Sequence, residues 1–237
     1  MSKPSSKNKP AESITPLPLR SAVFHSVQLA LPGRPCPGRP YPGWPLSQLR
    51  EPEPTNLSEL RAVLELMRTP GVGARTFQEL LNHYGTPLSA LDAVQSGLAR
   101  RDGWPLPRPT TKKSRPELLE RTLAYLEQLP TREGAIWYGH PDYPKSLLDW
   151  PEPPPLLFYR GFPEAWKRHP GIAIVGARQA SDAGRTFATH ITRELVLSGC
   201  TTISGGAMGI DAAVHEATID ARGLTIAVIA TGIDVVY

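Results

Sequence analysis

Two glycine-containing segments, each directly after a short apolar run, carry the residues best suited to bind an anion. The first is IAIV followed by GARQ, which contains Gly176 and Arg178, and the second is TTIS followed by GGAMG. A glycine loop that leads into a helix presents backbone N–H groups and the positive end of the helix dipole to a phosphate. A guanidinium can grip a phosphate through two hydrogen bonds or stack on a base. The residues expected to form this anion site are Gly176, Arg178, Arg185, Ser204, Gly205, Gly206, Met208 and Gly209.

Neighbouring strands must bring these two loops together. Segments 172–175, 200–204 and 224–230 are short and rich in apolar or β-branched residues, which is typical of buried parallel strands. The carboxyl ends of parallel strands lie at one edge of a sheet, so the loops should converge there. Gly209, which starts the next helix, is expected to serve the turn, and Gly206, in the middle of the loop, the phosphate.

Helices are expected between these strands. The first has Phe187, Ile191 and Leu195 one turn apart, the spacing of an apolar helix face. Gly199 and Gly223 stand where the two helices should end. This β-loop-α-β-loop-α-β series predicts half of a doubly wound α/β sheet.

A third glycine turn, TPGVG, separates two amphipathic segments in the first half of the chain. Helix, glycine turn and helix resemble the helix-hairpin-helix motif, in which the turn and the next helix present N–H groups to a DNA phosphate. A helical packing or protein-interaction module with the same turn explains these residues equally well. The residues expected to make a secondary DNA contact, the last two from a basic linker, are Gly71, Gly73, Arg75, Lys112 and Lys113.

The residues of common cofactor and catalytic sites are missing from the sequence. Neither glycine loop spells G-x-G-x-x-G, and Val196 stands about 20 residues past Gly176, where a dinucleotide site needs an acid. No Gly-Lys-Ser or Gly-Lys-Thr occurs, and the histidines are scattered. Asp211 and His215 lie one helical turn apart, so their side chains could pair. We expect such a pair to be a structural bond that anchors the loop rather than a catalytic dyad. We expect no catalytic residue, no metal and no cofactor.

Composition and charge narrow the class of protein. The chain has no run of about 18 apolar residues and no secretory signal, and its two cysteines lie far apart, so we expect a cytoplasmic protein with no membrane span. Residues 1–116 hold 16 Lys and Arg against 8 Asp and Glu, whereas residues 117–237 hold 10 against 14. If the chain binds nucleic acid, its general field comes from the front half, and the back half needs a few well-placed arginines.

Proline and charge also divide the chain into parts. Of the 27 prolines, 12 lie in the first 55 residues, where they prevent helices and strand ladders. The proline-bounded segment 153–161 is expected at a sheet edge. The expected divisions are a disordered, proline-rich basic tail at 1–55, a helical domain at 56–100, a basic linker at 101–116 and an α/β domain at 117–237.

From about Trp137 to its end, the chain closely resembles the DNA-processing protein A family (DprA, also called Smf). Three strings carry the resemblance, and they are specific in combination: VGAR, SGGAMGIDAAVH and TIAVIATGIDVVY. They follow the family patterns VGxR, SGxAxGIDxxxH and TIAVxxxGxDxxY. The segment 56–100 is similar, less specifically, to the family's small sterile-alpha-motif-like N-terminal domain.

The resemblance implies an extended Rossmann fold with a mostly parallel sheet beside a small all-helical domain. It implies a protein that binds single-stranded DNA without sequence preference and is not an enzyme. The implied partners are the RecA recombinase, loaded onto incoming DNA during natural transformation, single-strand-binding protein, and a second copy in a homodimer.

The chain departs from the family pattern in two places. The family often has Arg or Lys where Met208 stands, so one phosphate contact is missing or a thioether packs against a base instead. The family also continues past Tyr237 with more sheet and often a winged helix, so we expect the α/β domain of this chain to be incomplete.

A second reading of the glycine loop is enzymatic. The nucleoside-monophosphate phosphoribohydrolases of the Lonely Guy type share a Rossmann core and a loop similar to GGAMG. They also carry a Pro-Gly-Gly-x-Gly-Thr loop and a catalytic glutamate downstream, and that loop does not occur before Tyr237. A structural scaffold that recruits partners through its helices is a third reading, and binding data would separate it from the other two.

Overall fold

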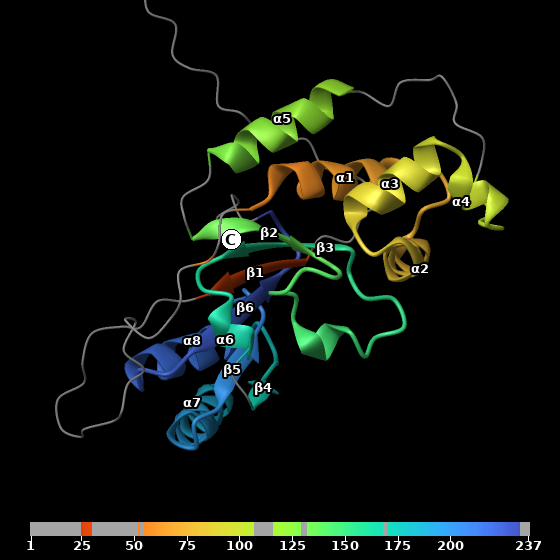
Figure 1. Ribbon diagram of the computed structural model, residues 1–237. Coiled ribbons are helices and arrows are strands. Elements are labelled where there is room, and N and C mark those ends of the chain that lie inside the picture. The colour runs from red at the N-terminus through yellow and green to blue at the C-terminus, as the bar shows by residue number, and fades with distance from the viewer. Residues whose placement is uncertain are drawn as a thin grey trace, which may run out of the picture.

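The structure, a computed structural model of the chain, describes residues 25–29, 52, 55–106, 116–128, 132–167 and 170–232. Helices gather at one end of the molecule, and a six-stranded sheet extends from them to a second group of helices at the other end (Figure 1). The expectations for most of the segment 1–55, and for the linker that holds Lys112 and Lys113, fall outside the described residues. Among the described helices, none combines the length and the apolar character that crossing a bilayer requires.

The helical unit begins where the sequence supplies a cap. Asn56 Oδ1 accepts hydrogen bonds from the backbone N–H groups of Ser58 at 3.1 Å and Glu59 at 3.3 Å, and so satisfies donors that the first turn leaves unpaired. Gly85, at a φ of 85°, ends the second helix in the left-handed region that glycine adopts without strain. The helices of this unit are α1 Leu57–Arg68, α2 Ala74–Tyr84, α3 Pro87–Gln95 and α4 Leu98–Arg101.

A single six-stranded sheet runs through the molecule. Its strands are β1 His25–Leu29, β2 Glu133–Trp137, β3 Leu156–Arg160, β4 Gly171–Ala173, β5 Thr201–Ser204 and β6 Thr225–Ile229. They lie in the order β2-β3-β1-β6-β5-β4. β4, β5 and β6 are parallel, with Ile172 opposite Thr202 and Ile203 opposite Ile226, while β2 and β3 are antiparallel. β1 pairs parallel with β3 and antiparallel with β6.

One apolar core joins the helical unit to the first part of the sheet. Leu60, Leu66 and Phe77 are at most 1% exposed. The same core contains Trp137 of β2, Leu156 of β3 and residues of α5 (Pro116–Glu127). Removing a large apolar side chain from water stabilises a fold by roughly 1.5–3 kcal/mol. The helical unit and the strands β2 and β3 are therefore held together by shared burial.

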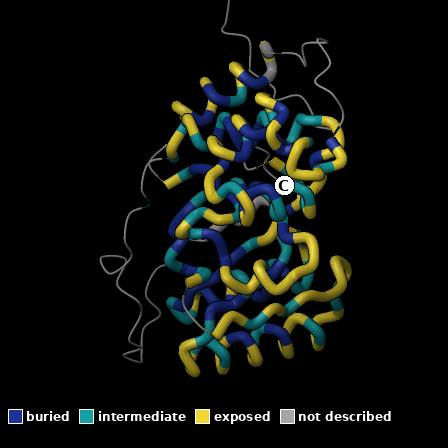
Figure 2. Tube along the Cα trace, turned by 45° about the vertical axis from the view of Figure 1, so that its right-hand side comes forward, coloured by how far each residue is buried: buried dark blue, intermediate teal, exposed yellow. Residues whose placement is uncertain are grey.

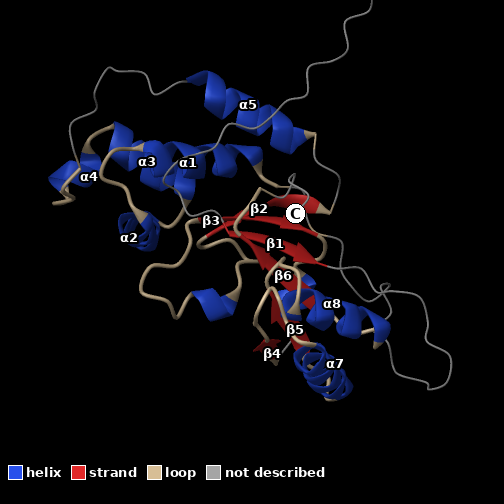
Figure 3. Cartoon of the chain, turned by 180° about the vertical axis from the view of Figure 1, so that it is seen from behind, coloured by secondary structure: helices blue, strands red, loops and turns tan. Residues whose placement is uncertain are grey.

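Two longer helices accompany the parallel strands. α7 (Asp182–Leu197) and α8 (Ile210–Asp220) pack against each other and against β5 (Figures 1 and 3). Two short helices, η2 (Lys145–Leu147) and α6 (Glu164–Lys167), lie in the connections before and after β3. The series β4-α7-β5-α8-β6 confirms the predicted α/β fold class with a parallel sheet beside a small helical unit.

Two strands occupy positions that differ from those expected. The proline-bounded strand β3 lies inside the sheet, paired with β2 and with β1, so its expected edge position is wrong. The prolines precede Leu156, and the strand itself therefore keeps all of its N–H donors. The reverse holds for β4, which was expected to be buried. β4 is the last strand of the described sheet, and Val175 just beyond it is 75% exposed.

The apolar face of α7 also differs from expectation. Ala188 and Thr192 are the residues that α7 buries, whereas Phe187 is 67% exposed and Ile191 38% exposed. Figure 2 shows exposed stretches along the end of the molecule that carries this helix. Small side chains let α7 approach α8 and β5 closely, and this packing turns the larger apolar residues away from the described sheet.

The two predicted helix ends are of different kinds. Gly199 ends α7 with a φ of 82°, as expected of a closing glycine. After α8, the left-handed residue is Arg222, at a φ of 56°. The expectation for Gly223 is corrected, because Gly223 has no positive φ and instead allows close packing: a Cβ there would lie 2.7 Å from Val196.

Part of the segment expected to lack regular structure forms a strand. Residues 19–31 contain no proline, although the segment around them is rich in it. β1 lies within this stretch, where every residue can donate to a strand ladder.

Candidate nucleic-acid interface

The loops after β4 and β5 meet at the carboxyl ends of these strands, which confirms their expected convergence. The backbone N–H of Ile210 donates to the carbonyl oxygen of Ala177 at 3.2 Å. The hydroxyl of Ser204 donates to the carbonyl oxygen of Ile174 at 2.7 Å, and the Ser204 side chain is buried. Ser204 therefore holds the ends of the two strands together, and its hydroxyl proton already has a partner.

Gly176 and Gly209 allow this close approach of the loops. Gly209 has a φ of 88°, and a Cβ there would lie 2.2 Å from the carbonyl oxygen of Ala177. A Cβ on Gly176 would lie 2.6 Å from Cγ1 of Ile210. Both distances are shorter than real contacts, so a side chain at either position would force the loops apart. The positive φ confirms the expectation that Gly209 serves the turn.

Gly205 and Gly206 lie against the groups beneath the loop. A Cβ on Gly205 would lie 2.5 Å from Oδ2 of Asp211, and one on Gly206 would lie 2.7 Å from Cγ2 of Ile229. Neither glycine has a positive φ. A methyl group on Gly206 would therefore disturb Ile229 as well as any ligand. The sequence predicted that Gly206 serves the phosphate, but a substitution there would affect packing and binding together.

Two side chains of α8 fix the glycine loop from below. Asp211 Oδ2 accepts a hydrogen bond from the backbone N–H of Ala207 at 3.3 Å. His215 Nε2 lies 2.8 Å from the carbonyl oxygen of Gly205, and its Nδ1 lies 2.7 Å from the hydroxyl of Thr225. A carbonyl oxygen only accepts, so Nε2 carries a proton, and in the neutral ring Nδ1 accepts from Thr225. Asp211 and His215 thus anchor the loop separately and do not pair with each other.

The outer side of the loops presents donors without partners. The backbone N–H groups of Arg178, Gly206 and Met208 donate to no group in the described part of the chain, nor does the Arg178 guanidinium. Arg178 and Gly206 are exposed, and Met208 is 78% exposed. Free N–H groups at the start of α8, beside one cation, are well suited to an anionic oxygen.

Arg185 has different surroundings from Arg178. Its guanidinium donates to the carbonyl oxygen of Ala180 at 2.6 Å and pairs with Asp182 in the first turn of α7. A phosphate at Arg185 would have to compete with the carboxylate of Asp182. The role of Arg185 in binding DNA remains a prediction, and the local contacts favour Arg178.

The helical hairpin has the geometry that its sequence suggested. Gly71 takes a φ of 84° in the turn, and Gly73 is the N-cap of α2, whose first N–H groups have no side-chain cap. Arg75 lies in the first turn of α2, 76% exposed, and pairs with Glu79 at 2.9 Å. Lys112 and Lys113 lie outside the described residues. A DNA contact at this hairpin remains a prediction.

Sequence reasoning missed two residues that shape the loops. Thr225 orients His215 from β6, and Ile210 fills the space that Gly176 leaves open. Thr225 stands at the start of TIAVIATGIDVVY and Ile210 within SGGAMGIDAAVH, so the signal was present. These two residues were interpreted only as parts of a strand and a helix, because the amino-acid sequence does not show which distant segments come into contact.

Comparison with known families matches both parts of this arrangement. The family described as "DprA-like N-terminal HHH domain" matches residues 58–115, which include the helical hairpin. The family described as "DNA recombination-mediator protein A" matches residues 134–237, which include both loops. The chain belongs to the DprA/Smf family.

Individual members of the DprA/Smf family agree with this assignment. Protein Smf of Synechocystis sp. is 44% identical over 100 residues, 41% of this chain and 25% of that protein. DNA processing protein DprA of Bacillus subtilis is 38% identical over 122 residues, 52% of this chain and 40% of that protein. The X-ray structure of DNA processing protein A from Streptococcus pneumoniae matches with a TM-score of 0.56 at 25% identity, over 75% of this chain and 60% of that chain. The chain thus matches less than half the length of these two sequence relatives.

Proposed function

We propose that this DprA/Smf chain binds single-stranded DNA, without sequence preference, at the two converging loops. The observation that carries the proposal is a group of N–H donors beside the exposed guanidinium of Arg178, none of which has a partner among the described residues. Every nucleotide has the same phosphate, so contacts of this kind are independent of the base sequence. A single strand can in addition expose its bases to side chains near the loop, which a duplex cannot.

Met208 is the side chain that we propose for such a base contact. It is 78% exposed on the glycine loop, where the family often has a cation. A thioether is polarisable and contacts aromatic rings favourably. In this proposal Met208 contributes a face for a base, while the N–H groups and Arg178 hold the phosphates.

The biological role that we propose is recombination mediation. A bound strand would be handed to the RecA recombinase, against single-strand-binding protein, when DNA enters the cell during natural transformation. A homodimer would bring together two strand-binding sites, one from the converging loops of each chain. This role requires binding and release but no covalent step, so we propose that the chain is not an enzyme. The name of its family and the names of its relatives, DNA processing protein DprA, support this role.

The first experiment compares single-stranded with duplex DNA of the same mixed sequence. Fluorescence anisotropy with an end-labelled oligonucleotide should show tighter binding of the single strand. The logarithm of the affinity should fall with the logarithm of salt, with a slope of about −0.7 for each phosphate neutralised. Equal or tighter binding of the duplex at physiological salt would contradict the proposal.

The second experiment tests the loop itself. Arg178→Ala should weaken single-strand binding by about tenfold, because a hydrogen bond to a charged group contributes about 1.5–3 kcal/mol. Melting should be unchanged, since the side chain is exposed and has no partner in the described part of the chain. Arg193→Ala is the matched control: it removes the same charge from α7, where Arg193 faces Asp220 at 3.9 Å, and it should bind like wild type. Equal affinities for the two variants would place the DNA elsewhere.

The role in recombination needs its own test. Addition of the chain should speed the assembly of RecA filaments on DNA coated with single-strand-binding protein, and Arg178→Ala should remove that effect. Tight DNA binding without any acceleration would separate the binding proposal from the mediator proposal and refute the latter.

A further inference from the structure

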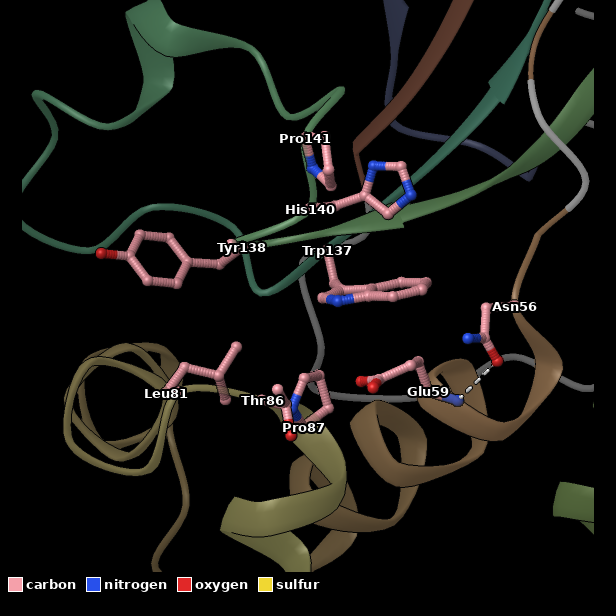
Figure 4. A pocket seen from close by; sticks show the side chains of 11 residues that line it. Asn56, Glu59, Leu81, Thr86, Pro87, Trp137, Tyr138, His140 and Pro141 are labelled. Carbon is pink, nitrogen blue, oxygen red and sulfur yellow. Dashed lines mark hydrogen bonds between the residues drawn. The ribbon is translucent and has the colours of Figure 1, made fainter.

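A hollow of about 300 Å³ lies between the helical unit and the end of β2. One side comes from the starts of α1 and α3, and the other from Trp137 at the end of β2 and residues 138–141 that follow it (Figure 4). None of its lining residues belongs to the two loops described above. Its volume is at the lower end of the range of small-molecule sites, about 300–1,000 Å³.

Aromatic side chains form the wall on the β2 side, and other contacts already hold them in place. The rings of Trp137 and His140 are 4.9 Å apart and nearly perpendicular, at 79°. The hydroxyl of Tyr138 donates to Asn82 Oδ1 at 3.0 Å, and the N–H of Asp142 donates to His140 Nδ1 at 3.0 Å. A ligand would not have to order these side chains, and this lowers the entropic cost of binding.

The opposite side includes two polar atoms that have no hydrogen-bond partner among the described residues. Glu59 Oε2 is buried and has no hydrogen-bond partner among the described residues. Burial raises the pKa of Glu59, because the charged form loses water, while a hydrogen bond from the backbone of Leu88 acts in the opposite direction. Asn56 uses its amide oxygen to cap α1, and its amide nitrogen donates to no described group. The hollow therefore combines one acceptor, one donor and aromatic walls.

We propose that this hollow binds a nucleobase that carries an exocyclic amino group, with cytosine as the preferred ligand. The amino group of cytosine would donate to Glu59 Oε2, the pairing that carboxylates make with this group. The neighbouring ring nitrogen or carbonyl would accept from the Asn56 amide nitrogen. The aromatic wall would cover the base by stacking or edge contacts. A phosphate is disfavoured here, because its charge has the same sign as that of Glu59.

The first test compares two nucleosides that differ only in the group at position 4 and in the protonation of the adjacent ring nitrogen. Deoxycytidine should bind the wild-type chain in isothermal titration calorimetry. Deoxyuridine presents a carbonyl to Glu59, so it should bind about tenfold or more weakly. Absence of saturable deoxycytidine binding, or equal affinity for both nucleosides, would overturn the proposal.

The second test changes the acceptor. Glu59→Gln should remove most of the preference for deoxycytidine. Glu65→Gln is the matched control on the same helix, outside the hollow, where Glu65 accepts from Gln95 at 3.2 Å, and it should bind like wild type. Unchanged deoxycytidine binding by Glu59→Gln would overturn the proposal. If Glu59→Gln fails to fold, the NMR signal of the Trp137 indole N–H in the wild-type chain provides the test. This signal should shift when deoxycytidine is added and stay in place with deoxyuridine. The absence of a shift with deoxycytidine would also overturn the proposal.

The third test identifies the source of the base. If a bound single strand supplies it, the hollow adds a base preference to the sequence-independent contacts of the loops. Wild type should then prefer oligo(dC) to oligo(dU) of equal length, and Glu59→Gln should erase that preference. Deoxycytidine binding without such a preference would mean that the hollow takes free nucleosides. Arg178→Ala should weaken binding of both oligonucleotides and leave deoxycytidine binding intact, so a failure of the loop proposal and a failure of this one can be told apart.

Discussion

The two ends of the molecule achieve close packing by different means. In the helical unit, Leu66 and Phe77 are at most 1% exposed, inside a core that continues into β2 and β3. At the end that carries α7, Phe187 is 67% exposed, and buried threonines take the place of large apolar residues. Thr202 and Thr218 there share a hydrogen bond of 2.7 Å.

This difference assigns the two ends different physical roles. Apolar burial scales with area and tolerates small shifts, so it suits a region that provides stability. The loops after β4 and β5 instead depend on short backbone contacts and on the glycines that allow them. Such contacts fail abruptly when a single atom is added, but they keep donor groups at fixed positions for a ligand.

The largest expected effect breaks the core of the helical unit. Phe77→Ala should lower the free energy of unfolding by about 3–5 kcal/mol, because it removes a buried ring and leaves a cavity. Phe187→Ala makes the same chemical change on an exposed side chain and should change the free energy of unfolding by about 0.5 kcal/mol or less. Urea denaturation measures both values. Similar losses in the two variants would contradict the comparison.

The next effect breaks the contact between the loops. Gly209→Ala should cost more than the roughly 1 kcal/mol of a side chain at positive φ, because its Cβ also collides with the backbone of the other loop. Gly199→Ala is the matched control: its φ is 82°, but nothing lies within 4 Å of its Cβ. We expect a larger fall in melting temperature for Gly209→Ala, together with weaker DNA binding. Equal effects would mean that φ strain alone matters at Gly209.

A smaller effect sharpens the functional side of the comparison. Met208→Arg adds the cation that the family often has on this loop and should tighten single-strand binding by about three- to tenfold, since one more phosphate is neutralised. Melting should not change, because Met208 is exposed. Leu197→Arg on α7 adds the same charge elsewhere, at a side chain that is 40% exposed, and should have little effect. Unchanged binding by Met208→Arg would mean that this position faces away from the DNA, and weaker binding would mean that the lost base contact outweighs the added charge.

The smallest effect concerns pH and the helical unit. Burial holds the pKa of Glu59 above its ordinary value of 4.5 in the folded state. The folded state therefore favours the protonated acid, and stability is lost as pH rises from the unfolded pKa through the folded one. Gln does not titrate, so the stability of Glu59→Gln relative to wild type should rise as the pH rises above about 4.5. Thermal melts across this range measure the difference, and a constant difference would refute the raised pKa.

The sequence by itself determined the features that depend on near neighbours along the chain. Gly199 was expected to close a helix, and it does so with left-handed backbone at a φ of 82°. The apolar runs separated by helices predicted the parallel series β4-α7-β5-α8-β6. These signals are local, because a cap, a turn or a helix face is formed by residues only a few positions apart.

Only the tertiary structure decided which side chains are left to act. Arg178 and Arg185 look alike in the sequence, but Asp182 and the carbonyl of Ala180 engage Arg185, while Arg178 has no partner among the described residues. Phe187 belongs to the apolar helix face that the sequence predicted but is exposed, while Glu59, in the first turn of α1, holds a buried oxygen. The physical reason for Phe187 and Glu59 is that burial depends on what another segment of the chain places opposite a residue, and that segment lies tens of residues away.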